Sequence, residues 1–317
     1  MLYRHICQRA EKRRRRGRRN QAAGAREGVF QPMKKILITG RSGYIAGKLE
    51  KWLNMHSDYQ IEMISLRDES WKEMTFDNYD TVVHLAGIAH VSTDPDMEDE
   101  YYRVNRDLTV EIAEKAKQSG VSQFIFMSSI IVYGNAGKAA TVIDEKTETS
   151  PDNFYGHSKL QAEKSIAPLQ DKQFRIAVIR PPMIYGQGSK GNYPKLAQAA
   201  VKLPLFPDFP NERSMLHIDN LTEFLRLLIK NGDAGLYFPQ NQEYVQTSRM
   251  VKAISDVHGS KMKLVPWFNP LIKRTLTKVG IMNKVFGTLI YDQRLSTYKE
   301  SYQIRSFTES IEQTEKG

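Results

Sequence analysis

The residues with the clearest capacity for chemistry are Tyr155 and Lys159, in the segment Tyr155-Gly156-His157-Ser158-Lys159. Residues four apart on a helix share a face, so the phenol and the ammonium are expected to point in the same direction. A neighbouring ammonium favours the phenolate and is expected to lower the pKa of Tyr155 from about 10. Such a phenol can exchange a proton with a hydroxyl or carbonyl oxygen.

A serine upstream supplies a third polar group. Ser128 and Ser129 follow the apolar segment 123–127, which predicts a buried strand. Proteins with parallel sheets place reactive groups at the carboxyl ends of strands, so Ser129 is expected to hydrogen-bond the reacting oxygen. Each pattern alone is more often structural than catalytic. Their order on these elements predicts a catalytic set of Ser129, Tyr155 and Lys159.

Strands and helices are expected to alternate from Met33 onward. The apolar patterns predict strands over 34–39, 61–66, 81–85, 123–127, 174–180 and 236–239. They predict helices over 45–53, 102–119, 155–169, 193–202 and 220–231. This alternation implies right-handed crossovers and a Rossmann-type, doubly wound parallel sheet in an α/β protein.

A glycine-rich turn separates the first predicted strand from the first helix. Glycines permit a tight turn and allow backbone N–H groups at a helix N-terminus to approach a pyrophosphate. The turn predicts a bound dinucleotide, NAD or NADP, whose nicotinamide would exchange hydride while Tyr155 exchanges a proton. The residues expected to contact it here are Gly40, Arg41, Ser42, Gly43, Tyr44 and Ile45.

The end of the second predicted strand bears on the choice of dinucleotide. An acidic residue there would hold the adenine ribose of NAD, but Ser65 occupies the nearest position, with Arg67 and Asp68 beyond it. Arg41 and Arg67 together suit the 2′-phosphate of NADP. Asp68 would serve NAD if the strand ran further, so both dinucleotides stay open.

The character of the chain changes after Pro182, where loops lengthen and proline becomes more frequent. We therefore expect a dinucleotide-binding domain over 33–181. Residues 182–317 are expected to form mainly a substrate-binding lobe, with one strand near 236–239 returning to the sheet. The segment 266–290 is expected to form amphipathic helices that pack within the lobe rather than anchor a membrane.

Several motifs in order carry a family resemblance over about 34–290. They are ILITGRSGYIA, TVVHLAG, YYRVN, FIFMSSIIVYG, YGHSK, IRPPMIYG and ERSMLHIDN. With these motifs the chain resembles the NAD-dependent epimerase/dehydratase family, the extended short-chain dehydrogenases. The resemblance implies an enzyme that acts on a nucleotide-activated sugar, expected to be UDP-linked.

The resemblance also implies roles for individual positions. Gly40, Gly43 and Ala46 would form the phosphate turn. Further contacts with the dinucleotide would come from Leu85, Ala86, Gly87, Asn105, Tyr155, Lys159 and Pro182. Substrate contacts would come from Ser129, and from Asn192 and Arg213 at the nucleotide diphosphate, a role that suits an arginine fork.

Departures from the family's patterns narrow the chemistry. Related 4,6-dehydratases carry an Asp-Glu pair after the catalytic hydroxyl residue, whereas Ile130 and Ile131 follow Ser129 here. Related 3,5-epimerases use a Cys–His pair, and this chain has no cysteine after Cys7. Met183 replaces an asparagine that 4-epimerases often carry. The first two differences disfavour dehydration and 3,5-epimerisation, and Met183 resembles the branch of polysaccharide-pathway epimerases and 4-keto-sugar reductases.

Three functions remain open on this basis. The first is a nucleotide-sugar 4-epimerase, in polysaccharide or cell-surface glycan precursor synthesis. The second is an NADPH-dependent reductase of a 4-keto deoxysugar, which Arg41, Arg67 and Met183 favour. The third is a non-catalytic dinucleotide- or RNA-binding protein, which the basic start of the chain favours and the intact Tyr155–Lys159 pair disfavours.

Charge is concentrated at the start of the chain. Of 46 basic and 36 acidic residues, ten and two lie in 1–32, which leaves 36 and 34 in the rest. We expect 1–32 to be a disordered basic extension, and Met33 stands where a natural start would fall. A nucleic-acid or membrane contact, or a targeting address, remains an alternative for this extension.

Composition excludes several classes of protein. One cysteine rules out an internal disulfide, and no His, Asp or Glu pattern has metal-ligand spacing, so no metal is expected. His84 and His217 are expected to be structural. We expect a cytoplasmic homodimer that binds no nucleic acid through its folded body and has no stable membrane insertion.

Overall fold

The computed structural model describes residues 33–89, 94–134, 140–276, 278 and 280–317. Residues 34–317 form one compact unit. The predicted basic extension, residues 1–32, lies outside the described residues.

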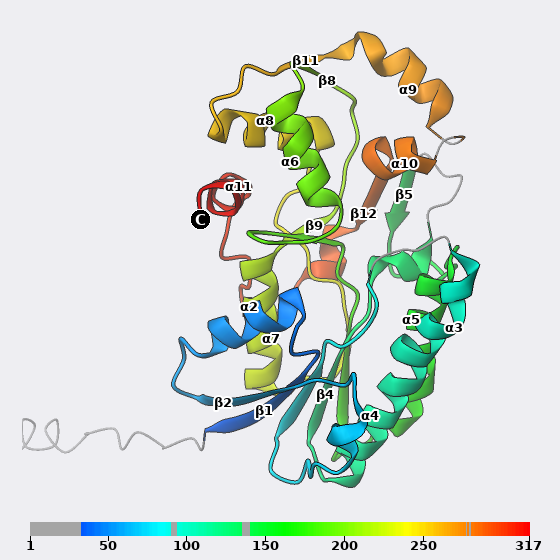
Figure 1. The fold of residues 1–317 in the computed structure, drawn as a ribbon, viewed down its shortest axis with the longest axis vertical. Coiled ribbons are helices and arrows are strands. Elements are labelled where there is room, and N and C mark those ends of the chain that lie inside the picture. The colour runs from blue at the N-terminus through cyan, green and yellow to red at the C-terminus, as the bar shows by residue number, and fades with distance from the viewer. Residues whose placement is uncertain (1–32, 90–93, 135–139, 277, 279) are drawn as a thin grey trace, which may run out of the picture. The chain divides into compact units, whose positions relative to one another are not determined.

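A parallel sheet of six strands, in the order β10-β6-β4-β3-β1-β2, forms the centre of this unit (Figure 1). Its strands are β1 (Lys34–Thr39), β2 (Tyr59–Ile64), β3 (Thr81–His84), β4 (Gln123–Met127), β6 (Arg175–Ile179) and β10 (Gly235–Tyr237). Ile36 pairs with Ile61 of β2 on one side and with Thr81 of β3 on the other. The strand order therefore reverses between β1 and β3, and a parallel sheet binds ligands at such a reversal.

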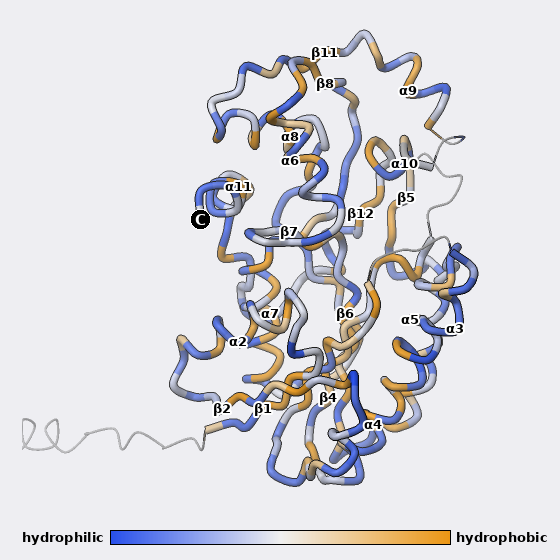
Figure 2. Tube along the Cα trace, in the orientation of Figure 1, coloured by the Kyte–Doolittle hydropathy of each residue, from blue (hydrophilic) through white to orange (hydrophobic). Residues whose placement is uncertain are grey.

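Long helices cover both faces of the sheet (Figure 1). They are α2 (Tyr44–Leu53), α4 (Leu108–Gln118), α5 (Phe154–Ile166) and α7 (Ile218–Asn231). Successive strand residues point to opposite faces, so Ile36 and Ile38 pack into the core with α2 and α7 while Leu37 packs with α4 and α5. Because both faces are buried, residues 36–38 of β1 and residues 124–127 of β4 are continuous apolar runs (Figure 2).

The predicted Rossmann-type fold is confirmed, with small differences in its elements. Strands 34–39 and 123–127 lie where they were predicted, while β2 begins and ends two residues before its predicted bounds. The predicted helix 102–119 is longer at its start. It begins as α3 (Glu98–Tyr102) and passes through a π-helical turn, Arg103–Asp107, before α4.

The late strand returns to the sheet as predicted, since β10 pairs with β6 in parallel. Three further two-stranded sheets pair β5 (Ala140–Ile143) with β12 (Thr288–Tyr291), β7 (Met183–Tyr185) with β9 (Met215–His217), and β8 (Leu205–Pro207) with β11 (Lys263–Val265). The later helices are α6 (Asn192–Lys202), α8 (Thr247–Val257), α9 (Asn269–Thr275), α10 (Gly280–Phe286) and α11 (Phe307–Lys316).

A second apolar core lies among these later elements. Tyr185, Met215, Met250, Phe286 and Phe307 belong to it. By contrast, α7 packs into the core of the main sheet, so residues after 182 contribute to both cores. In the described part of the chain, no helix combines the length and apolar character needed to cross a bilayer.

Candidate active site

The glycine turn joins β1 to α2 directly. Gly40 has a φ of 83°, and a Cβ there would lie 2.9 Å from the Ala86 nitrogen, so only glycine fits. The Gly43 nitrogen donates to the Gly40 oxygen at 2.7 Å, which closes the turn. Gly43 then caps α2 with no side-chain hydrogen bond to the helix. The first turn of α2 therefore presents backbone N–H groups, which suits a pyrophosphate.

The end of β2 lies against this turn. The nitrogens of Gly40 and Arg41 both donate to the Ile64 oxygen at 3.1 Å, so the residues after Ile64 lie beside the turn. Ser65 accepts from the Arg67 nitrogen at 3.2 Å, and both Arg41 and Arg67 are exposed. The turn and the strand end thus form a surface on which two arginines are available for an anion.

Asp68 has a structural role at this surface. Its carboxylate caps the short helix Glu69–Lys72 and accepts hydrogen bonds from the backbone and the hydroxyl of Ser70. These bonds lower the pKa of Asp68. Because β2 ends at Ile64, the extended strand that would bring Asp68 toward a ribose is not present.

The loop after β3 is held from two sides. The Ala86 nitrogen donates to the Thr39 hydroxyl at 3.3 Å. The Asn105 amide accepts from the Ile88 nitrogen at 2.9 Å and donates to the Ile88 oxygen at 3.1 Å and to the Ser158 hydroxyl at 3.2 Å. Asn105 is fully buried in the π-helical turn, so it positions the loop that contains Ala86 and Gly87.

The three predicted catalytic residues lie together. Ser129 follows β4 and begins a short helical turn, Ile130–Tyr133, whose Ile131 nitrogen donates to the Ser129 hydroxyl at 3.3 Å. Tyr155, in the first turn of α5, is 8% exposed, and Ser129 lies close enough to lower the pKa of its phenol against burial. The Lys159 ammonium donates to the Met127 oxygen at 3.0 Å, at the carboxyl end of β4.

Two glycines allow this close approach. A Cβ on Gly156 would lie 2.9 Å from the Ile131 oxygen, so α5 packs directly on the turn that contains Ser129. A Cβ on Gly87 would lie 3.1 Å from the Lys159 ammonium nitrogen and 2.8 Å from the Asn105 amide oxygen. The loop after β3 and α5 therefore meet at Gly87.

Burial is the largest influence on the pKa values of Tyr155 and Lys159. It raises the pKa of Tyr155 to about 12, against the effect of Ser129, and it lowers the pKa of Lys159 to about 8. The predicted lowering of the tyrosine pKa is therefore wrong for the protein alone. Lys159 directs its ammonium to the Met127 carbonyl and is not among the charges that act on the phenol.

A buried ion pair joins α5 to the end of β6, and the sequence analysis did not predict it. Arg180, at the end of β6, contacts Glu163 at 2.6 Å and donates to the Tyr133 hydroxyl at 2.7 Å. Glu163 also accepts from Ser128 and raises the pKa of Lys159 against burial. The four-residue spacing from Lys159 to Glu163 was the available signal.

Arg213 has the environment of an anion-binding group. Burial lowers its pKa to about 10, and its guanidinium donates to the Gly287 oxygen at 3.0 Å. No ion pair to Arg213 occurs among the described residues. Asn192 begins α6 and is exposed, while Pro182 is buried in the link from β6 to β7.

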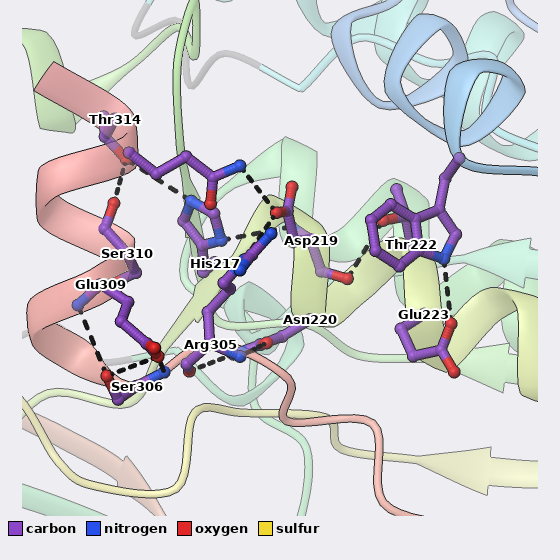
Figure 3. A network of polar contacts seen from close by, with 12 residues as sticks. His217, Asp219, Asn220, Thr222, Glu223, Arg305, Ser306, Glu309, Ser310 and Thr314 are labelled. Atoms are coloured by element: carbon purple, nitrogen blue, oxygen red, sulfur yellow. Dashed lines mark hydrogen bonds and ion pairs between the residues drawn. The ribbon is translucent and has the colours of Figure 1, made fainter. Parts of the chain in front are cut away.

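The two histidines are structural, as expected. His84 lies between the hydroxyls of Thr39 and Thr109 at 2.9 and 3.1 Å, and burial lowers its pKa to about 3. His217 caps α7 by accepting from the Asp219 nitrogen at 3.3 Å (Figure 3). Burial lowers the pKa of His217 to about 4.

The same close-up shows how the C-terminal segment is attached. The Arg305 guanidinium meets the Asp219 carboxylate at 3.1 Å, and the Arg305 backbone nitrogen donates to Asn220 at 2.8 Å (Figure 3). These contacts hold the start of α11 against the start of α7. In the described part of the chain, no group of three His, Cys, Asp or Glu residues is placed to hold a metal ion.

Comparison with known proteins gives relatives that match most of this chain. It is 29% identical to UDP-glucose 4-epimerase of Vibrio cholerae over 286 residues, 82% of this chain and 87% of the relative. It is 29% identical to N-acetyl-alpha-D-glucosaminyl-diphospho-ditrans,octacis-undecaprenol 4-epimerase of Escherichia coli O157:H7 over 251 residues, 73% of each chain.

Solved structures share the fold at lower identity. The dTDP-4-dehydrorhamnose reductase of Bacillus anthracis in complex with NADP superimposes with a TM-score of 0.66 at 16% identity, over 89% of this chain and 98% of that one. Residues 36–238 match the model of the NAD dependent epimerase/dehydratase family. The chain therefore belongs to this family, as an enzyme of the extended short-chain dehydrogenase type whose cofactor is NAD or NADP.

Proposed function

We propose that the protein is an NAD(P)-dependent 4-epimerase of a nucleotide-activated sugar, in the synthesis of polysaccharide or cell-surface glycan precursors. The observation that carries this proposal is the buried Tyr155 phenol beside Ser129, with Lys159 at the adjacent carboxyl end of β4. Likeness over most of both chains to a UDP-glucose 4-epimerase supports the same reaction class.

Each catalytic residue has a defined task in this reaction. Tyr155 accepts the proton of the sugar C4 hydroxyl and later returns it, while Ser129 hydrogen-bonds the same oxygen. When bound at the glycine turn, the oxidised dinucleotide supplies a hydride acceptor and a positive charge. Because burial keeps the phenol protonated in the protein alone, Tyr155 needs additional positive charge nearby to form the phenolate that accepts this proton. We assign Lys159, in its ammonium form, to the same task when the dinucleotide is bound, since it does not act on the phenol in the protein alone.

Arg213 supports a diphosphate in the substrate. Its guanidinium is enclosed without a carboxylate partner among the described residues, so a bound diphosphate would compensate its charge. We propose UDP as the nucleotide, with Asn192 contacting the same diphosphate. The E. coli relative is named for a polyprenol diphosphate sugar, and Arg213 would suit either carrier because both contain a diphosphate.

An NADPH-dependent 4-keto reductase is the second candidate. Arg41 and Arg67 lie at the ribose end without a free carboxylate beside them, because Asp68 caps a helix. Two arginines favour a 2′-phosphate, and NADPH in turn favours a net reduction. Tyr155 would then donate a proton once, to the oxygen of a 4-keto sugar. Ser129 and Lys159 would assist as they do in the epimerase.

Cofactor retention separates the two candidates. An epimerase is expected to keep its dinucleotide through purification, so mass spectrometry of the denatured protein should detect NAD or NADP. The purified protein should then interconvert UDP-glucose and UDP-galactose, or their N-acetylated forms, without added cofactor, as followed by proton NMR. Stoichiometric oxidation of added NADPH with a 4-keto sugar nucleotide would instead establish the reductase. Failure of both assays with a folded protein would refute both.

We also propose a division of the chain into two regions, an oligomeric state and a cellular location. We expect residues 33–181 to bind the dinucleotide, and 182–317 to form mainly the sugar-binding lobe. We also expect a cytoplasmic homodimer, to be tested by sedimentation velocity and cell fractionation. The retained Tyr155–Lys159 pair argues against a purely dinucleotide- or RNA-binding role.

A further inference from the structure

The lobe carries a surface of exposed apolar side chains with basic neighbours, here called the Trp267 surface. Its apolar members come from the end of α6 with β8 and from the segment that leads into α9. They are Leu205, Trp267, Phe268 and Leu271, joined by the pairing of β8 with β11, and Val201 and Leu203 are exposed in the chain just before β8. Trp267 is 66% exposed and Leu271 61% exposed. These values are high for large apolar side chains in a folded protein, and such clusters mark contact surfaces.

These side chains are not part of the lobe's own core. Ile272 and Leu276 of the same segment are buried in the second core, so α9 already has a face packed on the protein. Trp267 and Leu271, four residues apart, lie on an outward face. Trp267 and Phe268 stack with ring centroids 4.7 Å apart. The segment therefore has two apolar faces, of which only one is covered. Figure 2 shows apolar and polar residues alternating along it.

The stretch of chain that contains Trp267 carries charge of a single sign. Residues 257–291 contain no Asp or Glu but six basic residues: Lys261, Lys263, Lys273, Arg274, Lys278 and Lys284. All six are exposed. Because residues 33–317 have a net charge of only +2, the rest of that region is net negative. Residues 257–291 are thus a basic stretch in a region that is otherwise net negative.

We propose that the Trp267 surface binds the surface of a bilayer that contains anionic lipid. Aromatic and aliphatic side chains would enter the boundary between headgroups and acyl chains, while the lysines and Arg274 contact lipid phosphates. A second copy of this chain fits less well. A two-fold contact would bring the basic stretch of one copy close to that of the other. The association is peripheral, and it goes beyond the proposed function.

Vesicle flotation of the full chain tests this proposal. Vesicles of equal parts phosphatidylcholine and phosphatidylglycerol should carry the protein, and vesicles of phosphatidylcholine alone should carry much less. The double change Trp267→Ser/Leu271→Ser should lower the partition coefficient at least about tenfold, because two apolar side chains lose their burial. The matched control is Met55→Ser/Val142→Ser, which alters residues 65% and 57% exposed elsewhere and should bind as wild type does.

A second variant tests the charge, and three outcomes would overturn the proposal. Lys273→Gln/Arg274→Gln should weaken flotation and reduce its sensitivity to salt. Wild-type flotation by Trp267→Ser/Leu271→Ser would assign binding to another segment, such as residues 1–32, and overturn the proposal. Equal binding to both vesicle types would overturn it too, as would a dimer that Trp267→Ser/Leu271→Ser dissociates. Turnover of a soluble sugar nucleotide should be unchanged in all these variants, so this test is independent of the proposed function.

Discussion

Arg213 and Arg180 are both largely buried arginines, yet replacing each by methionine should have opposite effects on stability. Burial lowers the pKa of Arg213 from 12.5 to about 10. A base whose pKa is lowered by folding destabilises the folded state at every pH below that value. The shift corresponds to a destabilisation of about 3 kcal/mol. The hydrogen bond from Arg213 to the Gly287 oxygen offsets part of it.

Arg213→Met removes this penalty together with the hydrogen bond. We expect the free energy of unfolding at pH 7 to be unchanged or to rise by about 1–2 kcal/mol, because an apolar side chain replaces an uncompensated charge. The Michaelis constant for the sugar nucleotide should rise about 10- to 100-fold through loss of a charge-assisted hydrogen bond to the diphosphate. Urea unfolding and steady-state kinetics measure the two effects.

Arg180→Met is the matched control. Arg180 is paired with Glu163 at 2.6 Å, so its removal leaves a buried carboxylate and should cost about 3–5 kcal/mol. The reasoning is refuted if Arg213→Met destabilises the protein as much as Arg180→Met does. It is also refuted if the Michaelis constant of Arg213→Met is that of the wild type.

Three further predictions follow from the cofactor side of the site. Gly87→Ala should lower turnover at least about tenfold, since the new Cβ meets Asn105 at 2.8 Å and Lys159 at 3.1 Å, whereas Gly47→Ala, with no atom within 4 Å, should leave turnover unchanged. Arg41→Ser/Arg67→Ser should raise the Michaelis constant for NADPH about tenfold and leave that for NADH unchanged, and an equal effect on both would contradict a 2′-phosphate site. Burial lowers the pKa of Lys159 to about 8, so kcat/KM should fall as pH rises through 8. The buried ammonium destabilises the folded protein below pH 8, so the free energy of unfolding should not fall as pH rises through 8 and activity declines. A loss of stability in parallel with activity would contradict the assignment to Lys159.

The sheet could be predicted because its strands are buried on both faces. Val82 and Val83 of β3 and Phe124–Phe126 of β4 form short apolar runs between turn signals, a pattern that depends on local sequence alone. The end of β2 was less predictable. Leu66 continues the apolar pattern, but the chain leaves the sheet at Ile64, whose carbonyl accepts hydrogen bonds from Gly40 and Arg41 of the glycine turn.

Contacts between distant segments could not be predicted. β5, near the middle of the chain, pairs with β12, which lies close to its C-terminal end. The Arg180–Glu163 ion pair joins the end of a strand to a helix. The pKa of Tyr155 shows the same limit. Spacing placed Lys159 one helical turn away, but the phenol's burial and the carbonyl of Met127 that receives the ammonium depend on the packed structure.

Turnover by Tyr155→Phe tests the central claim most directly. Removing one hydroxyl from a buried ring should lower the rate of C4 inversion or reduction at least about a hundredfold, the scale of general acid–base catalysis. The urea midpoint and the dinucleotide content should stay near wild type. Tyr237→Phe, which removes a hydroxyl bonded to the Ala234 carbonyl, should turn over normally. Wild-type turnover by Tyr155→Phe would contradict the account.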